Sequence, residues 1–366
     1  MFKVKILKSE NADSYYAHLN EIDGYYTKTE EPPGRWLGRG AEALRLSGMV
    51  RESQFKELMN GRLGDRQLVQ NAGKEGRVKG FDCVVAPPKS VSVCWALGSK
   101  EDRAAIDRAF ARARDRVIER MEGSAVTRSG RGGLNKTEGA RLVVGAFRHD
   151  TNRAHEPSLH FHLVVLNAAV RSDGRTSTPD FSKVLRNQRA IGAEFRRELA
   201  RELRQEGFST QEVLAEDEKG KEYRSFELKD VSAELVEAFS GRSAEIKKLA
   251  KAEGVDRRIV NLRTRQRKEP IDRSRLEAAW RQIARGTGHT KNGQLSIRGD
   301  GIGENQPIQD HNREQAALQV GARAVGGTAA RGAALLLTAL KNNARRGREI
   351  EGIDRQLERK YESETI

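Results

Sequence analysis

The stretch RLVVGAFRHDTNRAHEPSLHFHLVVLNA, residues 141–168, contains the two segments of the chain with the clearest strand pattern. RLVVGAFR (141–148) and LHFHLVVLNA (159–168) are rich in apolar and β-branched residues, which favours strands. The segment between them, HDTNRAHEPS, is rich in turn-forming residues. The sequence therefore predicts two adjacent antiparallel strands joined by a turn.

Two further segments have strand patterns. Phe2, Val4 and Ile6 alternate with lysines, which is the pattern of a half-buried strand. GFDCVVA (80–86) is almost wholly apolar and ends at a pair of prolines, as expected of a buried strand. EPPGRWLGRG (31–40) is rich in proline and glycine and is predicted to be a loop.

Helical patterns lie between and after these strands. Ser99 and Asp102 form a capping box in front of a long segment whose apolar residues keep helical spacing. A second amphipathic helix is expected at about 186–206. Because strands and helices do not alternate regularly, we predict an α+β fold in which helices flank a central antiparallel sheet.

The composition limits the class of protein. The 366 residues include 67 Lys and Arg against 52 Asp and Glu, a net charge of +15, which favours nucleic acid as a partner over anionic membrane. Cys83 and Cys94 are the only cysteines, so a disulfide framework is excluded and a cytoplasmic location is expected. The sequence does not begin with a secretory signal, and arginines interrupt the apolar stretch at 320–340, so membrane insertion is not expected.

The distribution of charge predicts how the chain is divided. Residues 240–286 contain 14 Lys and Arg against 6 Asp and Glu, a local excess of 8. A charge run is usually a solvated helix face, but an excess this concentrated favours a surface that contacts phosphates. From about residue 295 the composition changes to Gly, Ala, Asn and Gln. We therefore expect a basic domain at 1–294 and a partly flexible, partly helical tail of unknown role at 295–366.

Three histidines are candidates for a metal centre. His160 and His162 are two residues apart on a predicted strand, so both imidazoles emerge on the same face of the sheet. His149 ends the preceding strand, where antiparallel pairing would bring it to the same patch. Three neutral imidazoles hold a metal ion while leaving positions open for water or a substrate oxygen. A histidine buried for structural reasons is the commoner case, but three together favour the ion.

Asp82 is a carboxylate within an apolar strand, where it needs a partner. One partner would be the second ring nitrogen of a metal-bound histidine, which Asp82 would orient. Capping of a nearby helix is an equally good interpretation from the sequence.

Four of the six tyrosines lie in two adjacent pairs, Tyr15 with Tyr16 and Tyr25 with Tyr26. Ordinary packing explains many tyrosines, and a phenol is a poor nucleophile near neutral pH because its pKa is about 10. A nearby metal ion removes that obstacle. Together with the histidines and the basic surface, the pairs predict attack on a phosphodiester, with a phosphotyrosine ester as product.

The segment GRGGLNKT (130–137) resembles a phosphate-binding P-loop, but Asn135 stands where the second glycine is required. We therefore interpret it as a flexible surface loop and predict that the chain does not bind ATP.

Several segments resemble one family in both composition and order. They are SYY and GYY near the N-terminus, RWLGRGAEALRLSG (35–48), GFDCVVAPPKSVS (80–92), FRHDTNRAHEPSLHFHLVV (147–165) and VEAFSGRSAEI (236–246). In this order they resemble the MobF-class conjugative relaxases of TrwC/TraI type. That class belongs to the HUH endonuclease superfamily, named for two histidines that flank a hydrophobic residue, here His160-Phe161-His162.

The resemblance implies an activity and roles for individual residues. Such enzymes nick one DNA strand at a plasmid origin of transfer, attach covalently to its 5′ end and start and end conjugative transfer. Tyr15 would be the nicking nucleophile and Tyr25 the second nucleophile, with Tyr16 and Tyr26 as supporting phenols. The histidines would hold a divalent ion, Mg²⁺ or Mn²⁺ with Zn²⁺ as a possibility, and Asp82 would orient one of them.

The resemblance also implies partners and DNA contacts. The substrate would be single-stranded DNA at an origin with a hairpin and a nick site, and the protein would enter the recipient cell attached to that DNA. Relaxosome proteins, a separate helicase and a type IV secretion coupling protein would assist, because the sequence has no intact P-loop and no helicase region. The residues expected to contact DNA are Trp36, Lys89, Arg153, Arg263, Arg265, Arg267 and Lys268. For Trp36, core packing is the alternative to stacking on a base.

Three other functions fit the same residues. A rolling-circle replication initiator of the superfamily would share the chemistry. A non-catalytic DNA-binding accessory protein would use the histidines structurally. A Zn²⁺ hydrolase would use the histidines with water and leave the tyrosines to packing.

Overall fold

The structure is a computed structural model that describes most of the first 295 residues. The described residues are 1–8, 33–129, 135–217, 220–264, 272–288, 290, 293 and 295. All of them belong to one unit of the chain, Met1–Gly301. The strands in these residues are β1 (Phe2–Lys8), β2 (Arg35–Leu37), β3 (Arg62–Leu63), β4 (Arg66–Gln67), β5 (Val78–Val85), β6 (Val126–Ser129), β7 (Asn135–Glu138), β8 (Arg141–Thr151), β9 (Pro157–Val170), β10 (Thr176–Ser177), β11 (Pro179–Asp180), β12 (Thr210–Glu216) and β13 (Glu222–Leu228).

Helices connect and cover these strands. In the described residues they are α2 (Arg39–Ala43), α3 (Glu52–Met59), α4 (Lys89–Leu97), α5 (Lys100–Ser124), α6 (Ser182–Arg186), α7 (Gln188–Gln205), α8 (Ala233–Ala238), α9 (Gly241–Glu253), α10 (Arg257–Arg263) and α11 (Arg273–Gly286). None of these helices combines the length and the apolar composition needed to cross a membrane.

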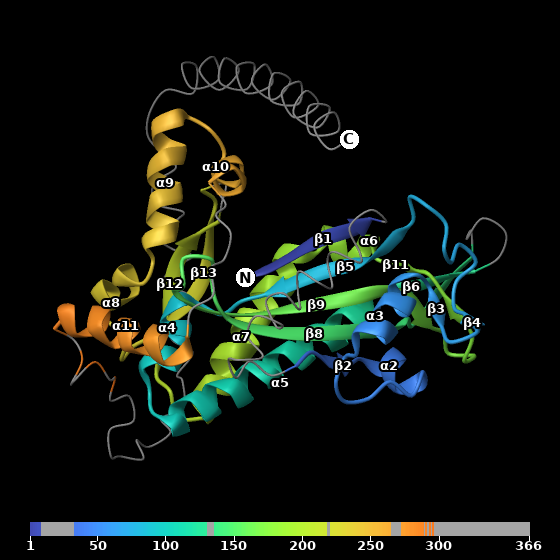
Figure 1. Ribbon diagram of the computed structural model, residues 1–366, viewed down its shortest axis with the longest axis horizontal. Coiled ribbons are helices and arrows are strands. Elements are labelled where there is room, and N and C mark those ends of the chain that lie inside the picture. Colours follow the sequence, from blue (N-terminus) through green and yellow to red (C-terminus); the bar gives the residue numbers. More distant parts are fainter. Residues whose placement is uncertain are drawn as a thin grey trace, which may run out of the picture. The chain divides into compact units, whose positions relative to one another are not determined.

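The main sheet has the order β1-β5-β9-β8-β2, with β10 paired to the end of β9 (Figure 1). Every pairing in it is antiparallel. The smaller sheets are a three-stranded one with the order β11-β6-β7, a pair formed by β12 and β13, and a pair formed by β3 and β4. The predicted α+β fold with a central antiparallel sheet is therefore confirmed.

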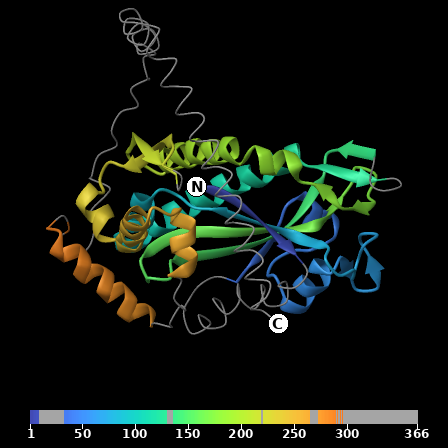
Figure 2. The same cartoon turned by 90° about the horizontal axis from the view of Figure 1, so that it is seen from above.

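The two faces of the main sheet bury different sets of side chains, because residues alternate in direction along each strand. Phe161, Leu163 and Val165 of β9 belong to the larger apolar cluster, which also contains the inner faces of α5 and α7. These two long helices run beside the strands on that side (Figure 2). On the other face, Val164 and Leu166 join a second cluster with side chains of β2, α2 and α3.

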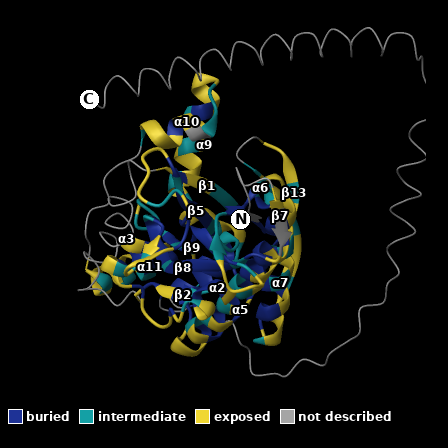
Figure 3. Cartoon of the chain, turned by 90° about the vertical axis from the view of Figure 1, so that its right-hand side faces the viewer, coloured by how far each residue is buried: buried dark blue, intermediate teal, exposed yellow. Residues whose placement is uncertain are grey.

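The second cluster ends partway along β9, and the histidines begin where it ends. Val164 is fully buried in this cluster, whereas His162 and His160 on the same face are partly exposed. Burial is concentrated in the central strands β5, β8 and β9, and exposed residues lie on the outer sides of the helices (Figure 3). The sheet thus presents a polar patch beside an apolar one on a single face.

Most predicted elements are present. The capping box is confirmed at the start of α5, since the Ser99 side chain accepts a hydrogen bond from the Asp102 backbone N–H and the Asp102 carboxylate accepts one from the Ser99 backbone N–H. The helix predicted at 186–206 corresponds to α7, and the strands predicted at 80–86, 141–148 and 159–168 correspond to β5, β8 and β9.

Two predictions about local structure are wrong. The segment 31–40 was expected to be a loop, but β2 and the start of α2 lie in its described part. The segment 130–137 was interpreted as a loop, yet β7 begins at Asn135 and pairs with β6. For β2 the partner is β8, which is distant in the sequence, whereas β7 forms a hairpin with the preceding strand β6; in each case strand pairing orders residues whose local composition favours a loop.

The basic region 240–286 is helical as predicted, because α9, α10 and α11 lie there. It is not solvent-facing throughout. Leu276, Trp280 and Ala284 of α11 are buried in the larger apolar cluster. α8 and α11 lie at the end of the sheet where β8 and β9 join, and β3 and β4 lie at the opposite end (Figure 1).

Candidate metal centre

Strand register brings His149, His160 and His162 together. His149 on β8 lies directly opposite His160 on β9 in the antiparallel ladder. His162 lies two residues further along β9, so its side chain leaves the same face of the sheet. His149 is buried, with 1% of its surface exposed, whereas His160 and His162 are partly exposed. The structure therefore places the three predicted ligands in one cluster.

The spacing of the three rings fits a shared ion. The ring centres are 5.2, 5.3 and 5.3 Å apart, so they form a nearly equilateral triangle. A metal–nitrogen bond of about 2.1 Å puts each ring centre about 3.2 Å from the ion, and three rings at tetrahedral angles then lie about 5.3 Å apart. Within the described residues, however, no group of three or more His, Cys, Asp or Glu side chains is already arranged to hold a metal ion. The donor type and the ring spacing suit an ion bound by three imidazoles, which makes this cluster a candidate metal centre and not a formed one.

Hydrogen bonds on the far side of two rings fix their orientation. Nδ1 of His162 lies 2.9 and 3.0 Å from the two carboxylate oxygens of Asp82, and Nδ1 of His160 lies 2.8 Å from the carbonyl oxygen of Ser158. Both acceptors need a proton on Nδ1, so in the neutral imidazoles Nε2 keeps its lone pair. This is the tautomer that a metal ligand requires.

Asp82 therefore hydrogen-bonds to a histidine of the cluster, which favours the first of the two interpretations that the sequence left open. On β5, Asp82 is paired with Val164, while Val84 is paired with His162. Asp82 thus reaches His162 diagonally across the same face of the sheet. Cys83, the neighbour of Asp82 on β5, is itself fully buried. Burial first, and then the charge of Asp82, raise the pKa of the Cys83 thiol well above its usual value.

Sequence reasoning missed Ser158 as a partner of the centre. Its contribution is a backbone carbonyl, which carries no residue-type signal. The start of β9 at Pro157 decides where this carbonyl points, and only the three-dimensional structure gives that information.

The expectation that Trp36 stacks on a DNA base is wrong for this structure. Its side chain is 5% exposed and belongs to the second apolar cluster. The indole ring is stacked with Phe55 at a centroid distance of 6.2 Å, and its N–H donates to Oε1 of Gln54 at 2.9 Å. The alternative of core packing is the one observed.

The expectation that Lys89 contacts DNA is also not supported. Its ammonium group donates to the carbonyl oxygen of Pro157 at 2.8 Å and lies 3.7 Å from Glu156, with 22% of the side chain exposed. Burial lowers the pKa of Lys89, and Glu156 partly opposes that effect. Lys89 therefore attaches the start of α4 to the start of β9.

The other predicted DNA contacts divide into two groups. Arg153 lies in the turn between β8 and β9 and is partly exposed. Arg263, at the end of α10, is exposed and donates to Oε2 of Glu253 at 2.7 Å. The remaining predicted residues lie outside the described part of the chain, namely Tyr15, Tyr16, Tyr25, Tyr26, Arg265, Arg267 and Lys268.

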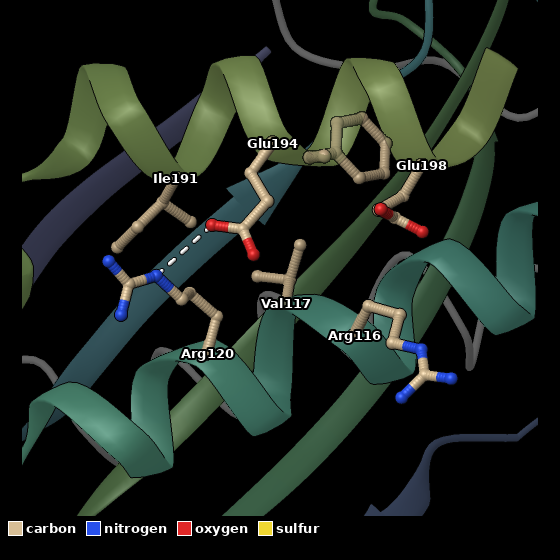
Figure 4. Close-up of a pocket in the computed structure, with 7 residues that line it drawn as sticks. Arg116, Val117, Arg120, Ile191, Glu194 and Glu198 are labelled. Atoms are coloured by element: carbon tan, nitrogen blue, oxygen red, sulfur yellow. Dashed lines mark hydrogen bonds and ion pairs between the residues drawn. The ribbon is translucent and has the colours of Figure 1, made fainter. Parts of the chain in front are cut away.

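A shallow surface depression lies between α5 and α7 (Figure 4). The ion pair between Arg120 and Glu194, 3.0 Å long, spans it. Its apolar floor includes Phe195, which belongs to the cluster on the opposite face of the sheet from the histidines. This depression is separate from the metal centre and offers no group that would take part in its chemistry.

Comparison with known proteins adds independent evidence. Residues 9–287 match the family model described as TrwC relaxase. The multifunctional conjugation protein TraI of Escherichia coli strain K12 is 34% identical over 301 residues, which is 78% of this chain and 16% of TraI. A second Escherichia coli TraI is 33% identical over 306 residues, again 16% of its length. The chain thus spans about a sixth of the length of these curated relatives.

Solved structures resemble the fold closely. The conjugative relaxase TrwC in complex with oriT DNA, in a copper-bound structure, has a TM-score of 0.67 and 31% identity. The alignment covers 79% of this chain and 99% of that one. TrwC complexed with a 27-mer DNA comprising the recognition hairpin and the cleavage site has a TM-score of 0.64 and 29% identity over the same shares.

The family model covers more than half of the chain, and the three histidines with their aspartate lie together within the matched region. The chain belongs to the TrwC relaxase family.

Proposed function

We propose that this protein nicks one strand of DNA at an origin of transfer by a tyrosine transesterification that needs a divalent metal ion, and that it thereby starts and ends conjugative transfer. The observation that carries the proposal is the triangle of three imidazoles with Asp82 behind one of them. The relatives that bind oriT DNA and metal ions support the substrate and the cofactor.

The bond changes of the reaction give each residue its role. The Tyr15 phenol oxygen attacks the phosphorus of the scissile phosphodiester and forms a 5′-phosphotyrosine ester. The bond from phosphorus to the 3′ oxygen breaks, and that oxygen takes up a proton to leave a free 3′-hydroxyl. A second transesterification by Tyr25 would end the transfer, with Tyr16 and Tyr26 as supporting phenols. The energy of the cleaved linkage stays in the ester, so rejoining needs no ATP.

The described residues prepare the place where this exchange occurs. His149, His160 and His162 hold the ion, which would neutralise charge that develops on the phosphate oxygens. Asp82 binds Nδ1 of His162 and so holds the ring with Nε2 on the side away from Asp82. A buried carboxylate beside a neutral imidazole also stabilises the tautomer that binds metal.

The chemistry of the donors bears on which ion is bound. Of the ions expected from the sequence, Mn²⁺ and Zn²⁺ suit imidazole nitrogen better than Mg²⁺, which prefers oxygen. We therefore expect the protein to bind Mn²⁺ more tightly than Mg²⁺. We expect both ions to support nicking, provided that the Mg²⁺ concentration is high.

Accessory proteins, a separate helicase and a secretion coupling protein remain proposed partners. Movement of the protein into the recipient cell with the DNA is likewise a proposal. The division at residues 294 and 295 likewise remains a proposal.

A covalent-adduct experiment tests the function. The protein is incubated with Mn²⁺ and a 3′-end-labelled single-stranded oligonucleotide that carries its origin, and the products are separated on a denaturing gel. We expect a protein–DNA band that resists denaturation, and we expect Tyr15→Phe to abolish it. Tyr223→Phe is the matched control, because Tyr223 on β13 lies against Arg196, with 4.4 Å from its ring centre to the guanidinium carbon.

The outcomes separate the competing functions. An adduct that forms at full yield in Tyr15→Phe would show that another residue is the nucleophile. No adduct with any origin sequence, together with metal-dependent hydrolysis, would favour a Zn²⁺ hydrolase. DNA binding with neither reaction would favour an accessory protein. An adduct that requires a replication origin in place of an origin of transfer would favour a rolling-circle initiator.

A further inference from the structure

Helix α11 contacts the β8–β9 hairpin at two points. Nη1 of Arg273 donates to Oδ2 of Asp150 at 2.9 Å. Nε1 of Trp280 donates to the carbonyl oxygen of His155 at 2.8 Å. Asp150 is at the end of β8, and His155 is in the turn between the strands. The two bonds join residues that are 123 and 125 positions apart in the sequence.

In the ion pair between Arg273 and Asp150 the carboxylate is buried and the guanidinium is half-buried. The side chains are 19% and 4% exposed respectively. Burial alone would lower the pKa of Arg273, but the charges of Asp150 and Glu277 outweigh it and raise that pKa. Removing one partner of such a pair leaves the other charge buried without compensation, which is costly. The pair is therefore a strong link between α11 and the end of β8.

Further charged groups extend the link to α4 and α5. Nε of Arg273 donates to Oε1 of Glu277 at 3.2 Å, and the same oxygen accepts from Nη1 of Arg103 on α5 at 2.8 Å. Nη2 of Arg103 donates to the carbonyl oxygen of Ala96 on α4 at 2.8 Å. One chain of contacts thus connects β8, α11, α5 and α4.

The indole of Trp95 lies at the middle of this network. The guanidinium carbons of Arg103, Arg148 and Arg273 are 5.2, 4.8 and 5.2 Å from its ring centre. Such cation–π contacts are favourable, and more so when they are shielded from water. Trp95 is only 5% exposed.

Two residues of this network flank the candidate metal ligand His149 in the sequence. Arg148 and Asp150 are the residues on either side of His149, and their side chains leave the face of the sheet opposite to His149. Arg148 donates to Oδ1 of Asp107 on α5 at 2.7 Å. The backbone that carries His149 is therefore flanked on both sides by charged residues in ion pairs with α5 and α11. The turn held by Trp280 continues into β9, where His160 lies.

We propose that Arg273 is a positioning residue for the metal centre, which acts through Asp150 to fix the end of β8 and the place of His149 relative to His160. This inference rests on the proposed function, because it assumes that the three histidines bind a metal ion. It assigns α11 to the catalytic apparatus, although α11 contributes no ligand. It follows that the metal-binding unit extends at least to the end of α11.

The test measures metal binding directly, apart from nicking. Mn²⁺ is titrated into the full-length chain in a calorimeter, with Arg273→Met, Arg273→Lys and Asp150→Asn as variants. Arg281→Met is the matched control, since Arg281 is on the same helix and also contacts Glu277, at 3.4 Å, but does not contact β8. Thermal unfolding and binding of single-stranded DNA in EDTA are measured for each protein.

We expect Arg273→Met and Asp150→Asn to raise the dissociation constant for Mn²⁺ about tenfold or more, as loss of outer groups at metal sites does. Single-turnover nicking should recover in these variants at high Mn²⁺, while DNA binding in EDTA stays within twofold of wild type. Arg273→Lys should recover part of the affinity, because it keeps a charge opposite Asp150 but loses the fork that also reaches Glu277. Arg281→Met should match wild type.

Other results would overturn the inference. If Arg273→Met and Asp150→Asn lower the melting temperature but leave the Mn²⁺ dissociation constant within twofold of wild type, the network is structural only. If Arg273→Met does not fold, Arg273→Lys and Asp150→Asn decide by the same criterion. Failure of the wild-type protein to bind Mn²⁺ would instead contradict the proposed function.

Discussion

Asp82 and His162 form the contact on which the proposed metal chemistry depends most directly. The carboxylate is 4% exposed, and both of its oxygens lie within 3.0 Å of Nδ1 of His162. A carboxylate in this position increases the basicity of the ligand nitrogen on the other side of the ring. Removing its charge should therefore weaken the metal site without removing a ligand.

Asp82→Asn is expected to raise the dissociation constant for Mn²⁺ by about 10- to 100-fold, since this is the usual effect of outer-group substitutions at metal sites. Calorimetric titration with Mn²⁺ measures it. Asp173→Asn is the control, because Asp173 is an exposed residue that pairs with Arg171 at 3.1 Å, beyond the end of β9 that is opposite to the histidines. An unchanged affinity for Mn²⁺ in Asp82→Asn would mean that the carboxylate has only a structural role as a hydrogen-bond acceptor in the buried strand.

His160→Ala tests the triangle itself. Loss of one of three ligands should reduce nicking by about two orders of magnitude or more, because the ion would be bound weakly and in the wrong place. Binding of single-stranded DNA in EDTA should not change, since no ion is present in that assay. Gel shifts in EDTA and adduct formation in Mn²⁺ measure the two quantities. Equal loss of both would indicate that His160 serves folding.

At the scale of secondary-structure elements, β2 shows how packing overrides local composition. Trp36 and Leu37 pair with Gly145 and Val144 of β8, and the indole packs against Phe55 of α3. Gly38 follows with φ of +89°, and a Cβ there would lie 2.5 Å from the carbonyl oxygen of Leu142. The glycine that suggested a loop is therefore required by the close approach of two backbones.

Trp36→Ala should lower the free energy of unfolding by about 3–5 kcal/mol, the usual cost of truncating a large buried aromatic residue. Trp36→Phe should cost less, because it keeps the contact with Phe55 and loses the hydrogen bond to Gln54. Urea denaturation measures both values. DNA affinity per folded molecule should be equal in all three proteins. A selective loss of DNA affinity in a stable Trp36→Ala protein would restore the base-stacking interpretation.

At the scale of the whole molecule, we expect the net charge of +15 to determine how strongly DNA binding depends on salt concentration. Basic groups that neutralise phosphates release counterions, so the logarithm of the binding constant falls linearly with the logarithm of the salt concentration. For single strands each phosphate contact contributes about −0.7 to that slope.

We expect a slope of about −3 or steeper for binding of single-stranded DNA in EDTA, measured by fluorescence anisotropy at several KCl concentrations, which corresponds to about four contacts or more. Reversing the charge of Arg263, with Arg263→Glu, should make the slope less steep if this exposed residue contacts a phosphate. A slope near zero would mean that the basic surface does not bind the backbone.

The sequence predicted much of the candidate site, and the residues show why. The spacing of His160 and His162 is a local property of a strand, so period two was enough to place both on one face. The choice between two roles for Asp82 was not local, because it depends on the register of β5 against β9. The same limitation applied to Lys89, whose partners are Pro157 and Glu156, and to Arg273, whose partner is Asp150.

By itself the sequence determined the class of fold, the main strands and helices, the capping box at Ser99 and the set of three candidate ligands. Each of these follows from periodicity or residue type within a short segment. The tertiary structure alone decided that Asp82 hydrogen-bonds to His162, that Trp36 is buried and that α11 contacts the β8–β9 hairpin. These outcomes depend on pairing and packing between segments that are tens to more than a hundred residues apart, and no local pattern encodes which partner will be nearest.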